Sequence, residues 1–145
     1  EITYEDFKAD LKALEDRGVE GLIIDLRNNP GGLLNICADI TDELLGEGDI
    51  VYTETKDGER EYLRSDKSQT NLPLLVLING GSASASEILA GAIRDHNRGE
   101  LIGTTTFGKG VVQRIRHIEG IGVDYIDEDL QLQKAMEILN SKIGS

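Results

Sequence analysis

Short apolar runs alternate along the chain with segments in which apolar and polar positions follow a helical pattern. Two runs, GLIIDL (21–26) and PLLVLIN (73–79), are nearly all apolar and rich in branched side chains, which is typical of parallel strands covered on both faces. Segments with apolar residues at every third or fourth position follow each run. This alternation predicts an α/β fold with a largely parallel sheet flanked by helices.

Four segments carry the helical pattern. The first begins at Thr3, where Asp6 completes an acidic variant of the capping box, a signature of a helix N-terminus. Further helices are predicted over residues 36–44, over 86–96 and from Asp127 onwards. The remaining strands, of which the first two form a predicted hairpin, are 50–55, 60–63, 100–103 and 111–118.

Length, composition and charge narrow the class of protein. The 145 residues are 39% hydrophobic and include only two prolines, which indicates a globular domain rather than a disordered chain. A net charge of −12 disfavours nucleic acids and anionic membranes as partners. No apolar run approaches the ~20 residues of a membrane span, and the first residues lack the order of a signal peptide. The single cysteine, Cys37, excludes an internal disulfide and is expected in the core; no metal or other cofactor is expected.

The segment NGGSASASEI joins the second apolar run to a predicted helix. Ser84 lies in this turn, where a helix N-terminus directs free backbone N–H groups toward an exposed side chain. An acyl-transfer nucleophile needs that setting. The alternative is that Ser82, Ser84 and Ser86 are all helix-capping hydroxyls in a tight turn. The turn is not a nucleophile elbow by sequence, since no GxSxG pattern runs through it.

A serine hydroxyl becomes a nucleophile when a base removes its proton, and a lysine serves as that base only as a neutral amine, which burial favours. Lys109, in FGKGVVQ, lies between glycines and ahead of two valines, in the least charged stretch that contains a lysine. If a strand runs through Gln113, the two side chains share one face, where the amide can orient the amine. The alternative is a surface lysine in a glycine loop.

The turn NNPGG ends the first apolar run, and ligands of open α/β sheets bind at the carboxyl ends of the strands. We expect an N–H of Gly31 or Gly32, together with the N–H of Ala85, to form an oxyanion hole. An ordinary turn with a rigid proline is the alternative. Asp25 and Arg27 are expected to frame the site rather than to act chemically.

Other chemistry has weaker support. His96 and His117 are both expected to be exposed, and they lack metal-ligand spacing, so a histidine-based triad ranks below the lysine mechanism. Residues 103–109 nearly match the phosphate-binding pattern GxxxxGK. However, Gly110 replaces the hydroxyl residue that holds magnesium, and a strand follows where the phosphate loop needs a helix.

The segments GLIIDLRNNPGG, LPLLVLINGGSASASEILAGAIRD and GTTTFGKGVVQ resemble the C-terminal-processing, or tail-specific, serine proteases. In that family the second serine of the SASAS run is the nucleophile, the lysine of FGKG is the general base, and the glutamine four residues on supports it. The resemblance therefore implies Ser84, Lys109 and Gln113 as catalytic residues. It also implies a fold similar to the crotonase and Clp peptidase group, and cleavage of proteins near their C-termini.

Two features depart from the family pattern. A PDZ domain usually precedes the helix that begins here at Thr3, and nothing like it is present, so we expect a single protease core domain over residues 1–145. The stretch near 117–124 is also shorter than the family pattern, either because the chain is shortened there or because residues are missing from the sequence. The resemblance implies two partners, a protein or peptide substrate with a C-terminal tail and the PDZ domain of a full-length parent. It also allows an oligomer. It implies an extracytoplasmic parent that is periplasmic, secreted or membrane-anchored.

Two other hypotheses stay open beside the peptidase. The chain can be a core that binds peptide but turns it over poorly or not at all. It can also be an acyl-thioester enzyme of the crotonase type, which only a fold analogy suggests. The last hypothesis leaves Lys109 and Gln113 without a role.

Overall fold

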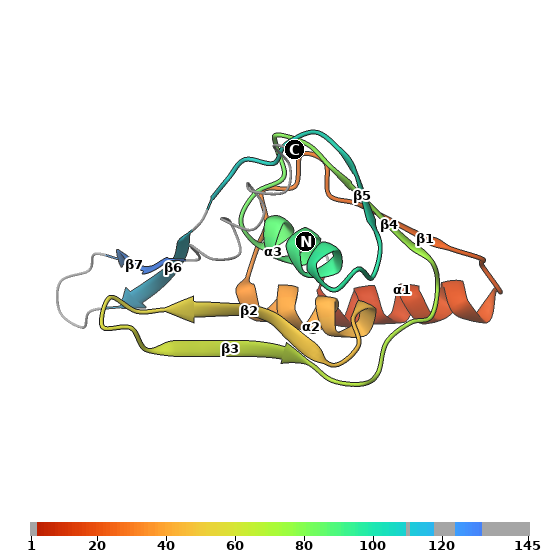
Figure 1. Ribbon diagram of the computed structural model, residues 1–145, viewed down its shortest axis with the longest axis horizontal. Coiled ribbons are helices and arrows are strands. Elements are labelled where there is room, and N and C mark those ends of the chain that lie inside the picture. The colour runs from red at the N-terminus through yellow and green to blue at the C-terminus, as the bar shows by residue number, and fades with distance from the viewer. Residues whose placement is uncertain (1–2, 110, 118–123, 132–145) are drawn as a thin grey trace.

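The computed structural model describes the backbone of residues 3–109, 111–117 and 124–131, and the side chains of residues 3–109. Figure 1 shows a parallel sheet on one side, an antiparallel hairpin on the other and helices packed between and beside them. No helix in these ranges is long and apolar enough to cross a membrane. In chain order the elements are α1 (Tyr4–Asp16), β1 (Leu22–Asp25), α2 (Leu34–Leu44), β2 (Gly48–Glu54), β3 (Arg60–Ser65), β4 (Leu74–Ile78), α3 (Ala85–Asp95), β5 (Glu100–Gly103), β6 (Val111–His117) and β7 (Asp124–Gln131).

Strands β1, β4 and β5 form a three-stranded parallel sheet in the order β1-β4-β5. The register pairs Ile24 with Val76 and Val76 with Leu101, so these side chains share one face. That face belongs to the core, where Leu74, Val76 and Ile78 are buried in one cluster with residues of α2 and α3. The predicted α/β fold with helices against a parallel sheet is confirmed.

The opposite face of this sheet is open at its two outer strands within the described part of the chain, so the expectation that β1 is covered on both faces is wrong there. On the central strand β4, Leu75 and Leu77 of that face are partly buried. Successive side chains of a strand point to opposite faces. Burial accordingly alternates along β1, where Ile23 is 63% exposed, and on β5 Ile102 is 47% exposed. The reason is that α2 and α3 lie on the same side of the sheet (Figure 1).

The second sheet is antiparallel and has the order β3-β2-β7-β6. The predicted hairpin of β2 and β3 is confirmed, with Tyr52 opposite Tyr62 and their ring centroids 5.5 Å apart. The helix predicted from Asp127 is wrong up to Gln131, because this segment pairs with β6 as strand β7, and sheet pairing overrides local propensity. The rest of that predicted helix lies outside the described residues, as does most of the predicted shortening.

The core lies between the two sheets and is built around α2 and α3. Its most deeply buried large side chains include Leu44 of α2, Val76 of β4 and Ile93 of α3. Full burial of such a side chain contributes roughly 1.5–3 kcal/mol. Cys37 is buried in the same cluster, as expected. Because α3 is held on both sides by this core, the turn that precedes it has a fixed position.

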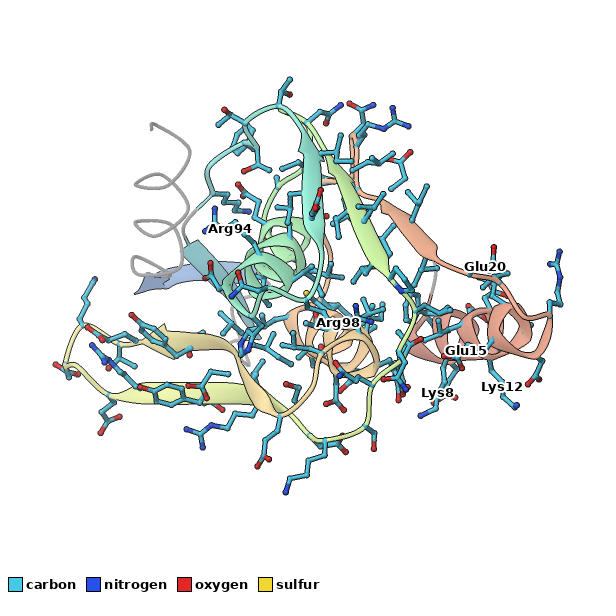
Figure 2. The ribbon with its side chains drawn as sticks, turned by 45° about the vertical axis from the view of Figure 1, so that its right-hand side comes forward. Lys8, Lys12, Glu15, Glu20, Arg94 and Arg98 are labelled. Atoms are coloured by element: carbon cyan, nitrogen blue, oxygen red, sulfur yellow. The ribbon has the colours of Figure 1, made fainter. Side chains whose placement is uncertain are left out.

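Arg98 follows the C-terminal end of α3 and binds the loops there. Its guanidinium donates hydrogen bonds to the carbonyl oxygens of Leu44, Thr70 and Leu72 at 2.7–2.8 Å. Partial burial lowers the pKa of Arg98 from its ordinary value. Figure 2 shows Arg98 within the molecule, whereas Lys8 on α1 points outward. The three bonds anchor the C-terminal end of α3, and the candidate site lies at its N-terminal end.

Candidate active site

Three loops meet beyond the carboxyl ends of the parallel strands, which is where ligands bind in sheets of this kind. The loops after β1 and β4 are joined by two asparagines: Asn79 Oδ1 accepts the Asn28 N–H at 2.9 Å, and Asn79 Nδ2 donates to Asn28 Oδ1 at 3.1 Å. The loop after β5 is attached through the Phe107 N–H, which donates to the Ser82 carbonyl oxygen at 2.9 Å. The predicted site residues other than Gln113 lie on these loops or at the start of α3.

Ser84 lies immediately before α3 in a backbone conformation that is uncommon for a residue with a side chain, with φ 56° and ψ −119°. Ser82 and Ser86 are buried, whereas Ser84 is partly exposed. The Ser82 hydroxyl has a structural role, because it donates to the Leu26 carbonyl oxygen at 2.7 Å and accepts the Asn79 N–H at 3.0 Å. The three serines are therefore not equivalent. Without a GxSxG sequence, Ser84 still occupies a strained strand-to-helix turn of the kind that presents a nucleophile.

Gly31 approaches the serine turn so closely that only glycine fits. Its φ is +90°, and a Cβ built on it would lie 2.6 Å from the Ala83 carbonyl oxygen and 2.7 Å from the Ala85 nitrogen. The Gly31 N–H donates to Asn29 Oδ1 at 2.9 Å, so Gly32 is the better placed of the two glycines to offer an N–H to a ligand. The Ala85 N–H is the first of α3, and the helix ladder does not use it.

Glu87, on the first turn of α3, connects the serine turn to the loop that carries Lys109. It is only 4% exposed, and its carboxylate accepts hydrogen bonds on both oxygens. Oε1 accepts the Thr106 hydroxyl and the Gly108 N–H, both at 2.7 Å, while Oε2 accepts the N–H groups of Ser84 and Lys109, both at 2.9 Å. Glu87 is absent from the residues predicted from the sequence. Its capping-box spacing of three residues after Ser84 is the signal that identifies it.

The structure brings Ser84 and Lys109 together through their backbones. Both N–H groups share one carboxylate oxygen of Glu87, and Lys109 is half-buried. No hydrogen bond joins the Ser84 hydroxyl to the Lys109 amine in the described part of the chain, and catalytic hydrogen bonds are often long before substrate binds. Gln113 lies on β6, where the pairing with β7 is irregular, and its side chain is outside the described residues.

The other candidates make no hydrogen bond or ion pair with Ser84, Glu87 or Lys109 in the described part of the chain. Asp25 and Arg27 form a paired ion contact at the surface, with 2.9 Å from Nε to Oδ1 and 2.6 Å from Nη2 to Oδ2, and the hydrogen bonds from Arg27 lower the pKa of Asp25 to about 2. His96 is exposed as expected, with Nε2 2.9 Å from the Asp49 carbonyl oxygen, and all of α3 separates it from the serine turn. The His117 side chain is outside the described residues, among which no group of His, Cys, Asp and Glu could hold a metal ion.

The sequence profile of peptidase family S41 matches residues 1–140, and the chain belongs to this family. The chain is 46% identical over 122 residues to the carboxyl-terminal-processing protease of Synechocystis sp., a match that covers 83% of this chain and 29% of that protein. It is 39% identical over 134 residues to the chloroplastic C-terminal processing peptidase of Tetradesmus obliquus, covering 90% of this chain and 28% of the relative.

The solved structure of the photosystem II D1 C-terminal processing protease has the same core. It matches with a TM-score of 0.79 at 35% identity, over 88% of this chain and 33% of that one. The resemblance inferred from the motifs is thus confirmed for the family and the fold. The chain spans about a third or less of the length of these relatives.

Proposed function

We propose that this chain is the catalytic core of a C-terminal-processing serine peptidase with Ser84 as the nucleophile. The observation that carries the proposal is the backbone of Ser84, with φ 56° and ψ −119° at the N-terminus of a buried helix. Backbone strain of this kind costs roughly 1–3 kcal/mol and collects at functional sites. The surrounding contacts of Gly31 and Glu87 support it by holding this turn from two sides.

In the proposed reaction the Ser84 hydroxyl attacks the carbonyl carbon of a peptide bond. Lys109, as a neutral amine, takes the hydroxyl proton and returns it to the leaving amine, and the resulting ester is hydrolysed by water that the same amine activates. Gln113 is proposed to orient the amine from strand β6. The hydrogen bonds to Glu87 support the pairing of nucleophile and base, since the backbone N–H groups of Ser84 and Lys109 both donate to Glu87 Oε2.

The oxyanion is proposed to be held by the N–H groups of Gly32 and Ala85. Gly31 is the less suitable donor, because its N–H already donates to Asn29 Oδ1. The Ala85 N–H has the further advantage that it belongs to a helix N-terminus, where the macrodipole favours negative charge.

The substrate is proposed to be a protein or peptide with a C-terminal tail. The names of the relatives, which process carboxyl termini, support this class of substrate. We also propose that residues 1–145 form one core domain of a longer parent. A PDZ domain of that parent is expected to present the tail, and the parent is expected to act outside the cytoplasm.

Labelling with a fluorophosphonate, which reacts with activated serines, tests this function. We expect one label, mapped by mass spectrometry to Ser84 and absent from Ser84→Ala. Lys109→Met, which removes the base but keeps most of the side-chain volume, is expected to lower the labelling rate at least about 100-fold. Lys67→Met, at an exposed lysine beside Glu47, is the matched control. A label on another residue, or an unchanged rate in Lys109→Met, would refute the mechanism.

A second candidate is a core that binds peptide without cleaving it. The observation in its favour is the absence of a hydrogen bond between the Ser84 hydroxyl and the Lys109 amine in the described part of the chain. This candidate requires measurable binding of apolar-tailed peptides together with no labelling of Ser84 and no cleaved product.

A further inference from the structure

Five large hydrophobic side chains are exposed in the described part of the chain, and two of them lie beside the candidate site. Ile23 and Ile102 belong to the open face of the parallel sheet, and Tyr62 belongs to the hairpin. Leu33 and Phe107, which are 62% and 67% exposed, lie instead on the loops after β1 and β5. Single exposed apolar residues are ordinary. The position of this pair relative to Ser84 gives it a specific meaning.

The two loops flank the nucleophile. The strand order β1-β4-β5 places β4, which leads to Ser84, between the strands that lead to Leu33 and Phe107. On the β1 side, a Cβ built on Gly31 would lie 3.1 Å from the Ser84 Cβ, and Leu33 follows two residues later. On the β5 side, the Phe107 N–H donates to the Ser82 carbonyl oxygen at 2.9 Å.

Leu33 also occupies a position that its residue type serves poorly. It is the N-cap of α2 and makes no side-chain hydrogen bond to the helix. Ser, Thr, Asp and Asn are preferred there because their side chains accept an unpaired N–H, and leucine is among the least favourable choices. A residue that breaks a local rule without a gain in packing is expected at functional sites. Because the Leu33 side chain is 62% exposed, apolar packing does not offset the missing capping hydrogen bond.

Phe107 has a fixed backbone and an exposed ring. Its own N–H is bonded to Ser82, and the next residue, Gly108, donates to Glu87 Oε1 at 2.7 Å. An aromatic side chain on an anchored backbone loses little conformational entropy when it contacts a ligand, so it forms a pre-organised contact surface.

We propose that Leu33 and Phe107 contact an apolar substrate side chain next to the scissile bond and thereby set a preference for apolar over charged residues at that position. This inference rests on the proposed peptidase function and adds the residues that select its substrate. An apolar side chain placed between Leu33 and Phe107 is removed from water without desolvating any polar group of its own. A carboxylate there would give up hydration without gaining a partner.

Peptide phosphonates that carry leucine or aspartate next to the phosphorus test the inference, since their relative labelling rates at Ser84 measure side-chain preference. Wild-type protein is expected to favour the leucine probe. The double variant Leu33→Ala/Phe107→Ala is expected to reduce the leucine-to-aspartate ratio about tenfold or more. Because the ratio compares two probes on one protein, any general loss of reactivity cancels. Ile23→Ala, at a residue that is 63% exposed on the open sheet face, is the matched control and should keep the wild-type ratio.

An unchanged ratio in the double variant, with both probes still labelling Ser84, overturns this inference and leaves the peptidase proposal standing. So does a result in which only self-association changes, because the pair would then be a contact between copies of the chain. Failure of every phosphonate, including a fluorophosphonate without a peptide, to label wild-type Ser84 overturns the peptidase function and this inference with it. Urea unfolding of each variant verifies that these exposed truncations leave the core intact.

Discussion

Gly31→Ala is the sharpest test of the claim that the loop after β1 holds the serine turn in place. The new Cβ would lie 2.6 Å from the Ala83 carbonyl oxygen and 2.7 Å from the Ala85 nitrogen. Both neighbours are backbone atoms, so no side chain can rotate away. The φ of +90° adds its own penalty, because an L-residue in the left-handed region costs roughly 1–2 kcal/mol.

Overpacking of a tight site typically costs 1–3 kcal/mol. Together with the backbone penalty we expect Gly31→Ala to lower the free energy of unfolding by about 2–5 kcal/mol. If the loop moves to relieve the clash, the stability loss shrinks, but Ser84 moves with its neighbours, and a displacement of about 1 Å can cost 100-fold in rate. Urea unfolding and the rate of fluorophosphonate labelling measure the two outcomes.

Gly58→Ala is the matched control for the backbone penalty alone. Gly58 has a φ of +82°, but a Cβ built on it meets nothing within 4 Å. It lies in the turn of the β2–β3 hairpin. In this variant the free energy of unfolding is expected to fall by about 1–2 kcal/mol, and the rate of fluorophosphonate labelling is expected to stay at the wild-type value. The reasoning is refuted if Gly31→Ala matches Gly58→Ala in stability and still labels Ser84 as fast as wild type.

Both carboxylate oxygens of Glu87 accept hydrogen bonds, and Glu87→Gln leaves only one acceptor oxygen. We therefore expect the free energy of unfolding, measured in urea, to fall by roughly 2–5 kcal/mol and the labelling of Ser84 to be slower. Thr106→Val, which removes a single donor, should cost less; equal costs would argue against a shared clamp. Burial raises the pKa of the Cys37 thiol to about 11, so in folded protein at pH 8 it should react with Ellman's reagent far more slowly than in urea. Because the folded state favours the neutral thiol, this contribution to stability is present at neutral pH and is lost as pH rises through about 11; equal rates in folded and unfolded protein would contradict the burial.

The parts of the fold that local chemistry determines were predictable from the sequence. The capping box of Thr3 and Asp6 marks the start of α1, and the charged turn between two alternating segments marks the β2–β3 hairpin. Strand β7 was not predictable in this way, because its pairing with β6 depends on the rest of the sheet. The exposed face at Ile23 was hidden for a similar reason, since an apolar run does not say whether one or both faces are covered.

The candidate site divides in the same manner. Ser84, Lys109 and Gln113 follow from the motifs and stay predictions until the labelling is done. The distinction between the N–H groups of Gly31 and Gly32 depends on where the Asn29 side chain turns, which no periodicity reveals. The sequence places glutamate in a capping box, but the use of its second oxygen by a loop some twenty residues away is a tertiary fact.

The attachment of the Lys109 loop has a consequence for how specificity can evolve. At positions 107 to 109 the loop is held through main-chain N–H groups, which every residue other than proline provides. The side chain at position 107 can therefore be exchanged by mutation while the backbone of the segment that carries Lys109 keeps its hydrogen bonds. If the residue at position 107 selects the substrate as proposed, a substitution there changes substrate preference while the hydrogen bonds of the segment to Ser82 and Glu87 are kept.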